Sequence, residues 1–313
     1  MRKAPPPSYE YDIETLVRYF KQAVKRILAE LERIDLTDPS RPFIQARLRE
    51  IARILSELNE QAREWVEENI PKAARDGVEA ALYELGIAKT MEEAAKLAQF
   101  NAVNKEVVAA AVADTQADLL AVTQNIDRKI RAAVRQVTAE VMRAKFTEGR
   151  NGRKELTRDL LRALRDRLGG AVETGIIDAA GRRWRPEVYV DLVARTKLND
   201  VHLEARRNEA IAHEAYYGII SSHGAKDACR FHENRIVKLV ESAPGPYPTI
   251  PQLRATGQIW HPNCKHTVHV LRDPDLLPEN LRRTAERQAA RGDAALRTGK
   301  RNPSDSEVEE VLM

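Results

Sequence analysis

Apolar residues recur every three or four positions through most of the first 168 residues, a spacing typical of amphipathic α-helices. The apolar positions of the first such stretch, residues 12–34, are Leu16, Phe20, Val24, Leu28 and Leu31. Ser40 is typical of a helix N-cap and predicts a second helix, which we expect to end at Gly86. Thr90 and Glu93 have the spacing of a capping box and predict a third helix.

The longest periodic segment lies between Val103 and Met142. Its most regular stripe consists of Leu119, Val122, Ile126, Ile130, Val134, Val137 and Val141. A helix with one apolar stripe needs an apolar partner, either another helix of the chain or a second copy of the chain. We expect the partner to lie within the chain, which predicts an antiparallel bundle over residues 12–169.

Glycines interrupt the helical pattern at Gly149–Gly152 and at Gly169–Gly170. A helix is predicted between them over residues 153–168, and the second pair marks the domain boundary that we expect near residue 170. Residues 1–11 are expected to form an extended arm, because three consecutive prolines disfavour a helix.

Beyond this boundary, short apolar runs bounded by turn residues predict strands. They are residues 217–221, 235–240 and 267–271, with a hairpin over 176–184 that turns at Gly181. Residues 278–313, which are basic and then acidic, are expected to form a frayed helix and a mobile tail. The predicted fold is mainly α with a small α+β C-terminal domain. Its expected parts are an arm (1–11), a long-helix bundle (12–169), a compact domain (170–277) and a charged tail (278–313).

The composition is typical of a globular protein: of 313 residues, 43% are hydrophobic and 31% charged, and the formal net charge is +4. No apolar run reaches the length of a membrane span, and the N-terminal residues lack the apolar core of a signal peptide. We therefore expect a soluble protein made in the cytoplasm. Two cysteines form no disulfide framework, which favours a reducing compartment.

All seven histidines and both cysteines lie between residues 202 and 269. Cys229 is followed three positions later by His232, and Cys264 two positions later by His266. Two closely spaced pairs are typical of a structural zinc site, because thiolate and imidazole ligands in a tetrahedron suit Zn²⁺.

Two further histidines, His223 and His261, are close enough in sequence to replace either imidazole of these pairs. Ordinary packing is the competing interpretation, because a cysteine is often a small buried hydrophobe. Spacing alone therefore leaves the ligand set open.

The order of short motifs in residues 170–272 carries a family resemblance. The motifs are Gly181 to Trp184, Tyr189, Arg195-Thr196, Ser221 to His223 with Cys229, and His261 to His266. This order resembles the minor capsid or head-morphogenesis proteins of tailed phages, the family similar to the Mu F protein.

In relatives of that family each pair contains two cysteines, whereas here His232 and His266 stand in place of the second cysteine. Both replacements keep a side chain that binds zinc. The resemblance therefore implies a zinc site formed by Cys229, His232, Cys264 and His266, with His261 in reserve.

The resemblance also implies a structural role in the phage head. Members of the family lie inside the procapsid, associate with the portal protein, and are thought to help head assembly and DNA packaging or delivery. The expected location is thus the capsid interior of the virion, and the host cytoplasm during assembly. The expected partners are the portal protein and the capsid interior.

A basic segment adds packaged DNA as a further expected partner, through contacts without sequence preference. Residues 143–167 hold nine basic and four acidic residues, although such runs are often only a solvated helix face. The candidate contacts are Arg150, Arg153, Lys154, Arg158, Arg162 and Arg165.

A metal-dependent nuclease of the His-Asn-His kind is the alternative function. The residues that suggest it are Asp227, His261, Asn263, His266 and His269. Such an enzyme needs an open position on its metal, which four protein ligands would fill. The sequence therefore favours a protein that is not an enzyme.

Overall fold

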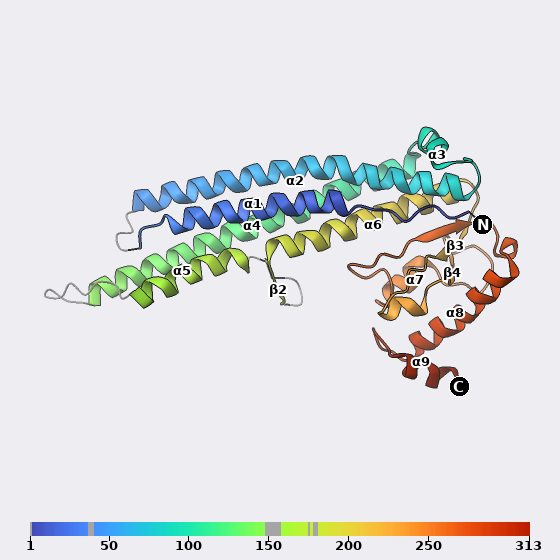
Figure 1. Cartoon of the computed structure of the whole chain (residues 1–313). Helices are drawn as coiled ribbons and strands as arrows, with labels where there is room; N and C mark the ends of the chain where they lie inside the picture. The colour runs from blue at the N-terminus through green and yellow to red at the C-terminus, as the bar shows by residue number, and fades with distance from the viewer. Residues whose placement is uncertain (1, 37–40, 148–157, 175, 178–180) are drawn as a thin grey trace. The chain divides into compact units, whose positions relative to one another are not determined.

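The structure is a computed structural model that describes residues 2–36, 41–147, 158–174, 176–177 and 181–313. The helices are α1 (Glu10–Glu32), α2 (Arg41–Glu84), α3 (Met91–Leu97), α4 (Ala102–Thr147), α5 (Arg158–Glu173), α6 (Pro186–Ala212), α7 (Ile250–Ala255), α8 (Glu279–Arg297) and α9 (Asp305–Leu312) (Figure 1). The strands are β1 (Ile176–Ile177), β2 (Arg183–Trp184), β3 (Tyr217–Ile220), β4 (Ile236–Lys238) and β5 (Val268–Leu271), and the 3-10 helices are η1 (Ala228–Phe231) and η2 (Pro274–Leu276). The predicted fold class is confirmed. Within the described ranges, no helix is both long enough and apolar enough to cross a bilayer.

The chain divides into two compact units that interleave along the sequence. Unit 1 comprises Met1–Tyr9, Asn69–Val112 and Arg195–Met313, and unit 2 comprises Glu10–Glu68 and Ala113–Ala194. Because α2, α4 and α6 each contribute residues to both units, the limits of the units do not coincide with the expected domain limits near residues 170 and 278.

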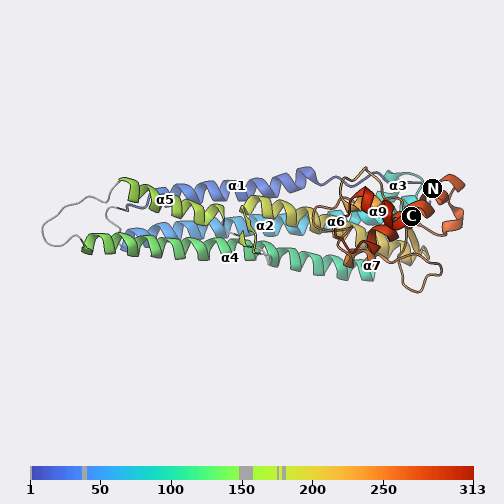
Figure 2. The ribbon, with the colours of Figure 1, turned by 90° about the horizontal axis from the view of Figure 1, so that it is seen from below.

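Unit 2 is a helical bundle in which α1, α5 and segments of α2 and α4 run side by side (Figure 2). The whole predicted stripe of α4, from Leu119 to Val141, is buried, with no member more than 4% exposed. Thr123 Oγ1 on the same helix donates to Asn59 Oδ1 of α2 at 2.6 Å. The prediction that this stripe finds its apolar partner within the chain is therefore confirmed.

Helix α5 continues through Gly169 and Gly170, where the sequence predicted a break. Leu164, Leu168 and Val172 lie four residues apart and are buried, with α5 packed on α1. Each glycine costs about 1 kcal/mol of helix propensity relative to alanine. Burial of three apolar side chains outweighs that cost, because each contributes about 1.5–3 kcal/mol.

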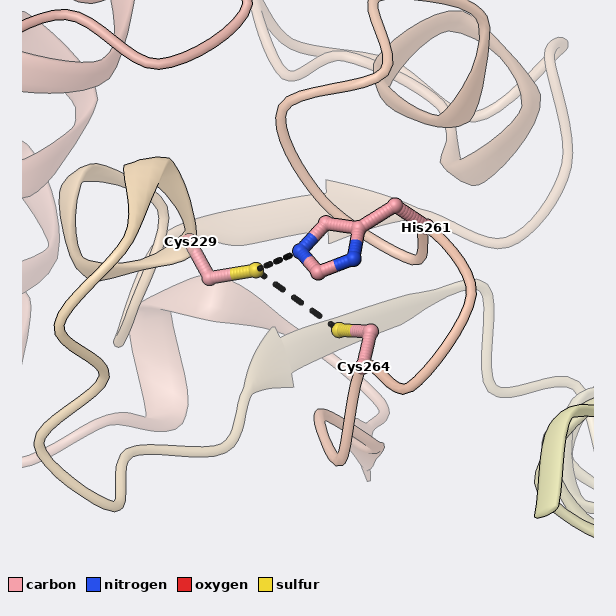
Figure 3. A group of neighbouring side chains, drawn as sticks. All are labelled: Cys229, His261 and Cys264. Carbon is pink, nitrogen blue, oxygen red and sulfur yellow. Dashed lines mark hydrogen bonds between the residues drawn. The ribbon is translucent and has the colours of Figure 1, made fainter. Parts of the chain in front are cut away.

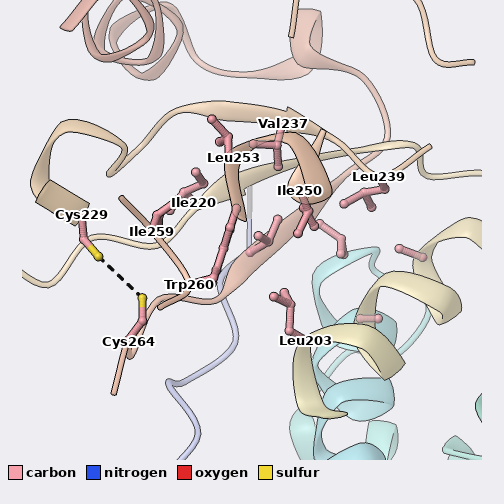
Figure 4. Packing of buried hydrophobic residues seen from close by; sticks show 14 of the residues in the cluster. Leu203, Ile220, Cys229, Val237, Leu239, Ile250, Leu253, Ile259, Trp260 and Cys264 are labelled. Atoms are coloured by element: carbon pink, nitrogen blue, oxygen red, sulfur yellow. Dashed lines mark hydrogen bonds between the residues drawn. The ribbon is translucent and has the colours of Figure 1, made fainter. Parts of the chain in front are cut away.

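Unit 1 contains a three-stranded antiparallel sheet in the order β4-β3-β5. Gly218 of β3 pairs with Val237 of β4 and with Val270 of β5. These strands agree with the three that the sequence predicted. A separate antiparallel pair, β1 and β2, agrees with the predicted hairpin. The sheet residues Ile220, Val237 and Val270 pack into one apolar cluster with side chains from α6 and α7 (Figure 4).

The segment expected to be a mobile tail forms α8 and α9 and is packed in unit 1. Ala294 and Ala295 of α8 and Val308 of α9 are completely buried, in one cluster with Phe231 of η1. Small alanine side chains allow close packing of α8 on η1 but give a weak apolar signal in a sequence rich in arginine. This is why the sequence pattern pointed to a tail.

A buried carboxylate, Glu84 of α2, joins four segments of unit 1. Its Oε1 accepts a hydrogen bond from the Ala4 N–H of the N-terminal arm at 2.9 Å, and its Oε2 accepts one from the Val270 N–H of β5 at 2.9 Å. It also pairs with the Arg206 guanidinium of α6 and with His269 Nδ1 of β5. Burial alone would raise the pKa of Glu84, but the charge of Arg206 and the hydrogen bond with His269 outweigh burial and lower that pKa.

Helices α2 and α6 approach closely at Gly77, inside unit 1. A Cβ on Gly77 would lie 2.3 Å from the carbonyl oxygen of His202 and 3.1 Å from the backbone nitrogen of Arg206. Neither atom can move aside unless α6 shifts as a whole. His202 is held in turn by Tyr9 of the arm, whose hydroxyl lies 2.9 Å from His202 Nδ1.

Removing the charge of Glu84 is expected to destabilise the protein strongly. Glu84→Gln leaves Arg206 buried without its counter-charge. Removal of one charge of a buried ion pair lowers the free energy of unfolding by about 3–5 kcal/mol. The free energy of unfolding in urea should fall by about that amount. The control Glu279→Gln breaks a pair with Arg283 whose side chains are 66% and 75% exposed, and it should cost less than about 1 kcal/mol. Equal effects of the two variants would contradict the role assigned to Glu84.

Two glycine-to-alanine variants are expected to change stability in opposite directions. Gly77→Ala should lower the free energy of unfolding by about 1–3 kcal/mol, because its methyl group overlaps the backbone of α6. Gly170→Ala should raise it by about 0.5–1 kcal/mol, because Gly170 is helical and a Cβ there would meet nothing within 4 Å. Thermal and urea denaturation of both variants measure this, and a destabilised Gly170→Ala would contradict the α5 assignment.

Candidate metal centre

Cys229 lies on η1, the short turn between β3 and β4. Asp227 caps the turn, since its Oδ1 accepts a hydrogen bond from the Cys229 N–H at 3.1 Å. The thiol is buried, and Cys229 and Cys264 lie together at the edge of the apolar cluster around Ile259 and Trp260 (Figure 4). The cap and the cluster together fix the direction of the Cys229 side chain.

His261 and Cys264 lie on the loop between α7 and β5. Trp260 and Asn263 have φ values of 53° and 69°, and the Cys264 N–H donates to the His261 carbonyl at 2.9 Å. Asparagine tolerates this left-handed conformation better than most residues. The tight loop therefore places the imidazole and the thiol, three positions apart, on one side.

The side chains of Cys229, His261 and Cys264 converge, with all their ligand atoms within 4.8 Å of one another (Figure 3). Cys229 Sγ lies 3.7 Å from Cys264 Sγ and 3.2 Å from His261 Nε2. Two thiolates bound to one tetrahedral Zn²⁺ at about 2.3 Å lie about 3.8 Å apart. The spacing of the two sulfur atoms and the donor set therefore fit zinc.

The hydrogen bond between the two thiols makes their acidities different. It is the main cause that lowers the pKa of Cys264, to about 4, against the opposing effect of burial. The same contact raises the pKa of Cys229. Cys264 is therefore the thiol of the pair that loses its proton more easily, and a bound metal would displace the thiol protons.

His266 is buried next to Cys264, and its two ring nitrogens face different groups. Nδ1 lies 3.3 Å from Cys264 Sγ, and Nε2 lies 3.1 Å from Glu233 Oε1. Burial alone would raise the pKa of Glu233, but hydrogen bonds from the N–H groups of Ala225 and His223 outweigh it and lower that pKa to about 2. Glu233 is therefore a carboxylate, held against His266.

One side of the site opens to solvent through a pocket of about 350 Å³. Lys226, Asn263, Lys265 and Asn302 line it together with Cys229, Cys264 and His266. The His261 side chain is 20% exposed, whereas the Cys229 and Cys264 residues are at most 9% exposed. An ion from solvent would reach the two sulfur atoms through this pocket.

The structure places His232 outside the group of Cys229, His261 and Cys264, unlike the ligand set that the resemblance implied. Its Nε2 lies 2.9 Å from Gln258 Oε1. Gln258 in turn donates to the carbonyl oxygens of Ala295 and Lys300. The physical reason is that Gln258, which is itself bonded to Ala295 of α8, engages Nε2 of His232, while α8 packs against η1.

The structure describes the side chains of two of the six candidate nucleic-acid contacts. Arg150, Arg153 and Lys154 lie outside the described residues, as does the side chain of Arg158. Arg162 and Arg165 are exposed on α5 in unit 2, and Arg165 Nη1 donates to the carbonyl oxygen of Glu32 at 2.9 Å.

A family model described as phage minor capsid protein 2 matches residues 44–289 of the chain. The chain belongs to this family. The matched region extends from α2 into α8 and includes every candidate metal ligand. Membership confirms the expected class of structural phage head proteins. No curated protein and no solved structure matches the chain.

Sequence reasoning missed the roles of Glu233 and Gln258. Glu233 directly follows His232, but this position carries no sign that its partner is His266, 33 residues further along the chain. Gln258 lies in a loop without a recognisable pattern. Both roles depend on contacts between segments that only folding brings together.

Proposed function

We propose that this minor capsid protein acts without catalysis inside the phage capsid, at the portal, where it helps head assembly and DNA packaging or delivery. The family match over residues 44–289 is the observation that carries this proposal. The portal and the capsid interior are then its partners in the virion, and assembly takes place in the host cytoplasm.

We further propose that one structural Zn²⁺ is held by Cys229, His261, Cys264 and His266. The convergence of two thiols and an imidazole, with a second imidazole 3.3 Å from Cys264 Sγ, supports it. Bound zinc would supply folding free energy by joining η1 to the loop before β5.

The positions of the residues that suggested a nuclease support that alternative less than they support the structural role. His269 is engaged with Glu84 and Arg206 in the core of unit 1, so it is not part of the group around Cys264. His261 and His266 are both assigned to the proposed zinc site. Once both histidines bind the metal, the open metal position that a hydrolytic mechanism needs is filled.

Zinc content and zinc affinity of purified variants test the proposed ligands. Wild-type protein is expected to bind one zinc per chain, and Cys229→Ser or Cys264→Ser to lose it. His261→Ala should weaken binding more than about 100-fold, above the usual effect of residues that only hydrogen-bond a ligand. His232→Ala, the matched control, should keep full affinity, since His232 faces Gln258. Loss of zinc from His232→Ala alone would reverse the choice between the two histidines.

Incubation with duplex DNA separates the structural role from the nuclease. The protein is tested with Mg²⁺, Mn²⁺ or Zn²⁺ beside a His261→Ala, His266→Ala double variant. We expect intact DNA, and any retention of DNA should fall steeply as salt rises, without sequence preference. Capture of the wild-type protein by assembled portal is expected in parallel. Metal-dependent cleavage that the double variant lacks would overturn the proposal.

A further inference from the structure

A histidine that binds a metal must be neutral, and only one tautomer of neutral His266 then satisfies its contact with Glu233. A neutral imidazole carries one N–H and one lone pair. Glu233 Oε1, 3.1 Å from Nε2, is a carboxylate oxygen and can only accept a hydrogen bond. In the metal-bound form Nε2 therefore carries the proton, and the lone pair of Nδ1, which lies 3.3 Å from Cys264 Sγ, is left for the metal.

Glu233 is itself held rigidly by the chain. Its Oε1 accepts hydrogen bonds from the N–H groups of His223 and Ala225, each at 3.0 Å. Its Oε2 accepts one from Ser222 Oγ at 2.9 Å. Two of these donors are backbone groups, so the position of the carboxylate is set by the loop after β3 and not by flexible side chains.

We infer that Glu233 is a positioning residue that orients His266, so that Nδ1 of His266 completes the metal site as its fourth ligand. The inference rests on the zinc site proposed above. A carboxylate that accepts the free N–H of a histidine ligand fixes its tautomer and ring orientation and makes the ligating nitrogen more basic. Glu233 lies on the side of the ring away from Cys264, which is the place such a partner must have.

A separate metal site at His223, Glu233 and His266 is a competing interpretation, because their ligand atoms also lie within 4.8 Å of one another. A carboxylate offers about four lone-pair positions. Three chain donors and His266 already use four at Glu233. His223 is moreover exposed, so the group lacks the free, convergent oxygen donors that a second ion requires.

The test compares the zinc affinity of Glu233→Gln with that of the wild-type chain, by competition with a chromophoric chelator. Glutamine keeps the size of the side chain but loses the charge and replaces one accepting oxygen by a donor. We expect affinity to fall about 10- to 100-fold. The matched control Glu241→Gln changes an exposed glutamate of the same unit and should have no effect.

A double variant separates positioning from general damage to the fold. If Glu233 acts through His266, Glu233→Gln should cause no further loss of affinity in a His266→Ala background. An equal loss in both backgrounds would overturn the inference, and so would an unchanged affinity of Glu233→Gln when the wild-type chain binds zinc. A wild-type chain that binds no zinc would instead overturn the zinc proposal itself, and this inference with it.

Nitrogen-15 NMR of histidine-labelled, zinc-loaded wild-type protein supplies a readout that does not depend on a variant that folds. The expected signature of His266 is a protonated Nε2 and a metal-bound Nδ1. A His266 ring that carries its proton on Nδ1 would overturn the inference.

Discussion

The buried charge of Glu84 is the interaction on which the arrangement of unit 1 depends. A carboxylate in the core is strongly unfavourable unless charges and donors surround it. Here the donors come from the N-terminal arm, α6 and β5, so these segments must meet at the end of α2. The same requirement fixes β5, because two of its neighbouring residues, His269 and Val270, contact the carboxylate.

The contacts of Glu84 also constrain where the candidate metal ligands lie. Arg206, which pairs with Glu84, donates through Nη1 to Thr267 Oγ1 at 3.1 Å. Thr267 directly follows His266, and β5 begins one residue later. The loop that carries His261 and Cys264 is therefore attached at its end to the most constrained part of unit 1. Cys229 lies on a different segment, the turn η1, against which α8 packs.

A small sheet of three short strands buries little apolar surface by itself, so other interactions must hold its loops. Two sets of contacts hold the loops of this sheet. The alanine-rich face of α8 packs on η1, and the cysteines and histidines gather at the edge of the apolar cluster. In a structural phage head protein, a C-terminal region packed in this way offers a defined surface.

The sequence determined by itself those features that depend on neighbours in the chain. Periodicity placed α1 and the buried stripe of α4, a cap and a terminal glycine placed α2, and turn residues placed the strands, because these patterns extend over a few residues. The concentration of cysteine and histidine also marked the region of the candidate site, in which Cys229 and Cys264 lie close together.

Only the tertiary structure decided the features that depend on distant segments. Packing on α1 carried α5 through two glycines, and packing on η1 ordered α8. The position of His232 outside the group of Cys229, His261 and Cys264 also depends on distant contacts, since Gln258 engages its Nε2 and is itself bonded to α8. Spacing along the chain cannot distinguish such histidines, because the choice is made by residues that lie more than twenty positions away and are brought close only by folding.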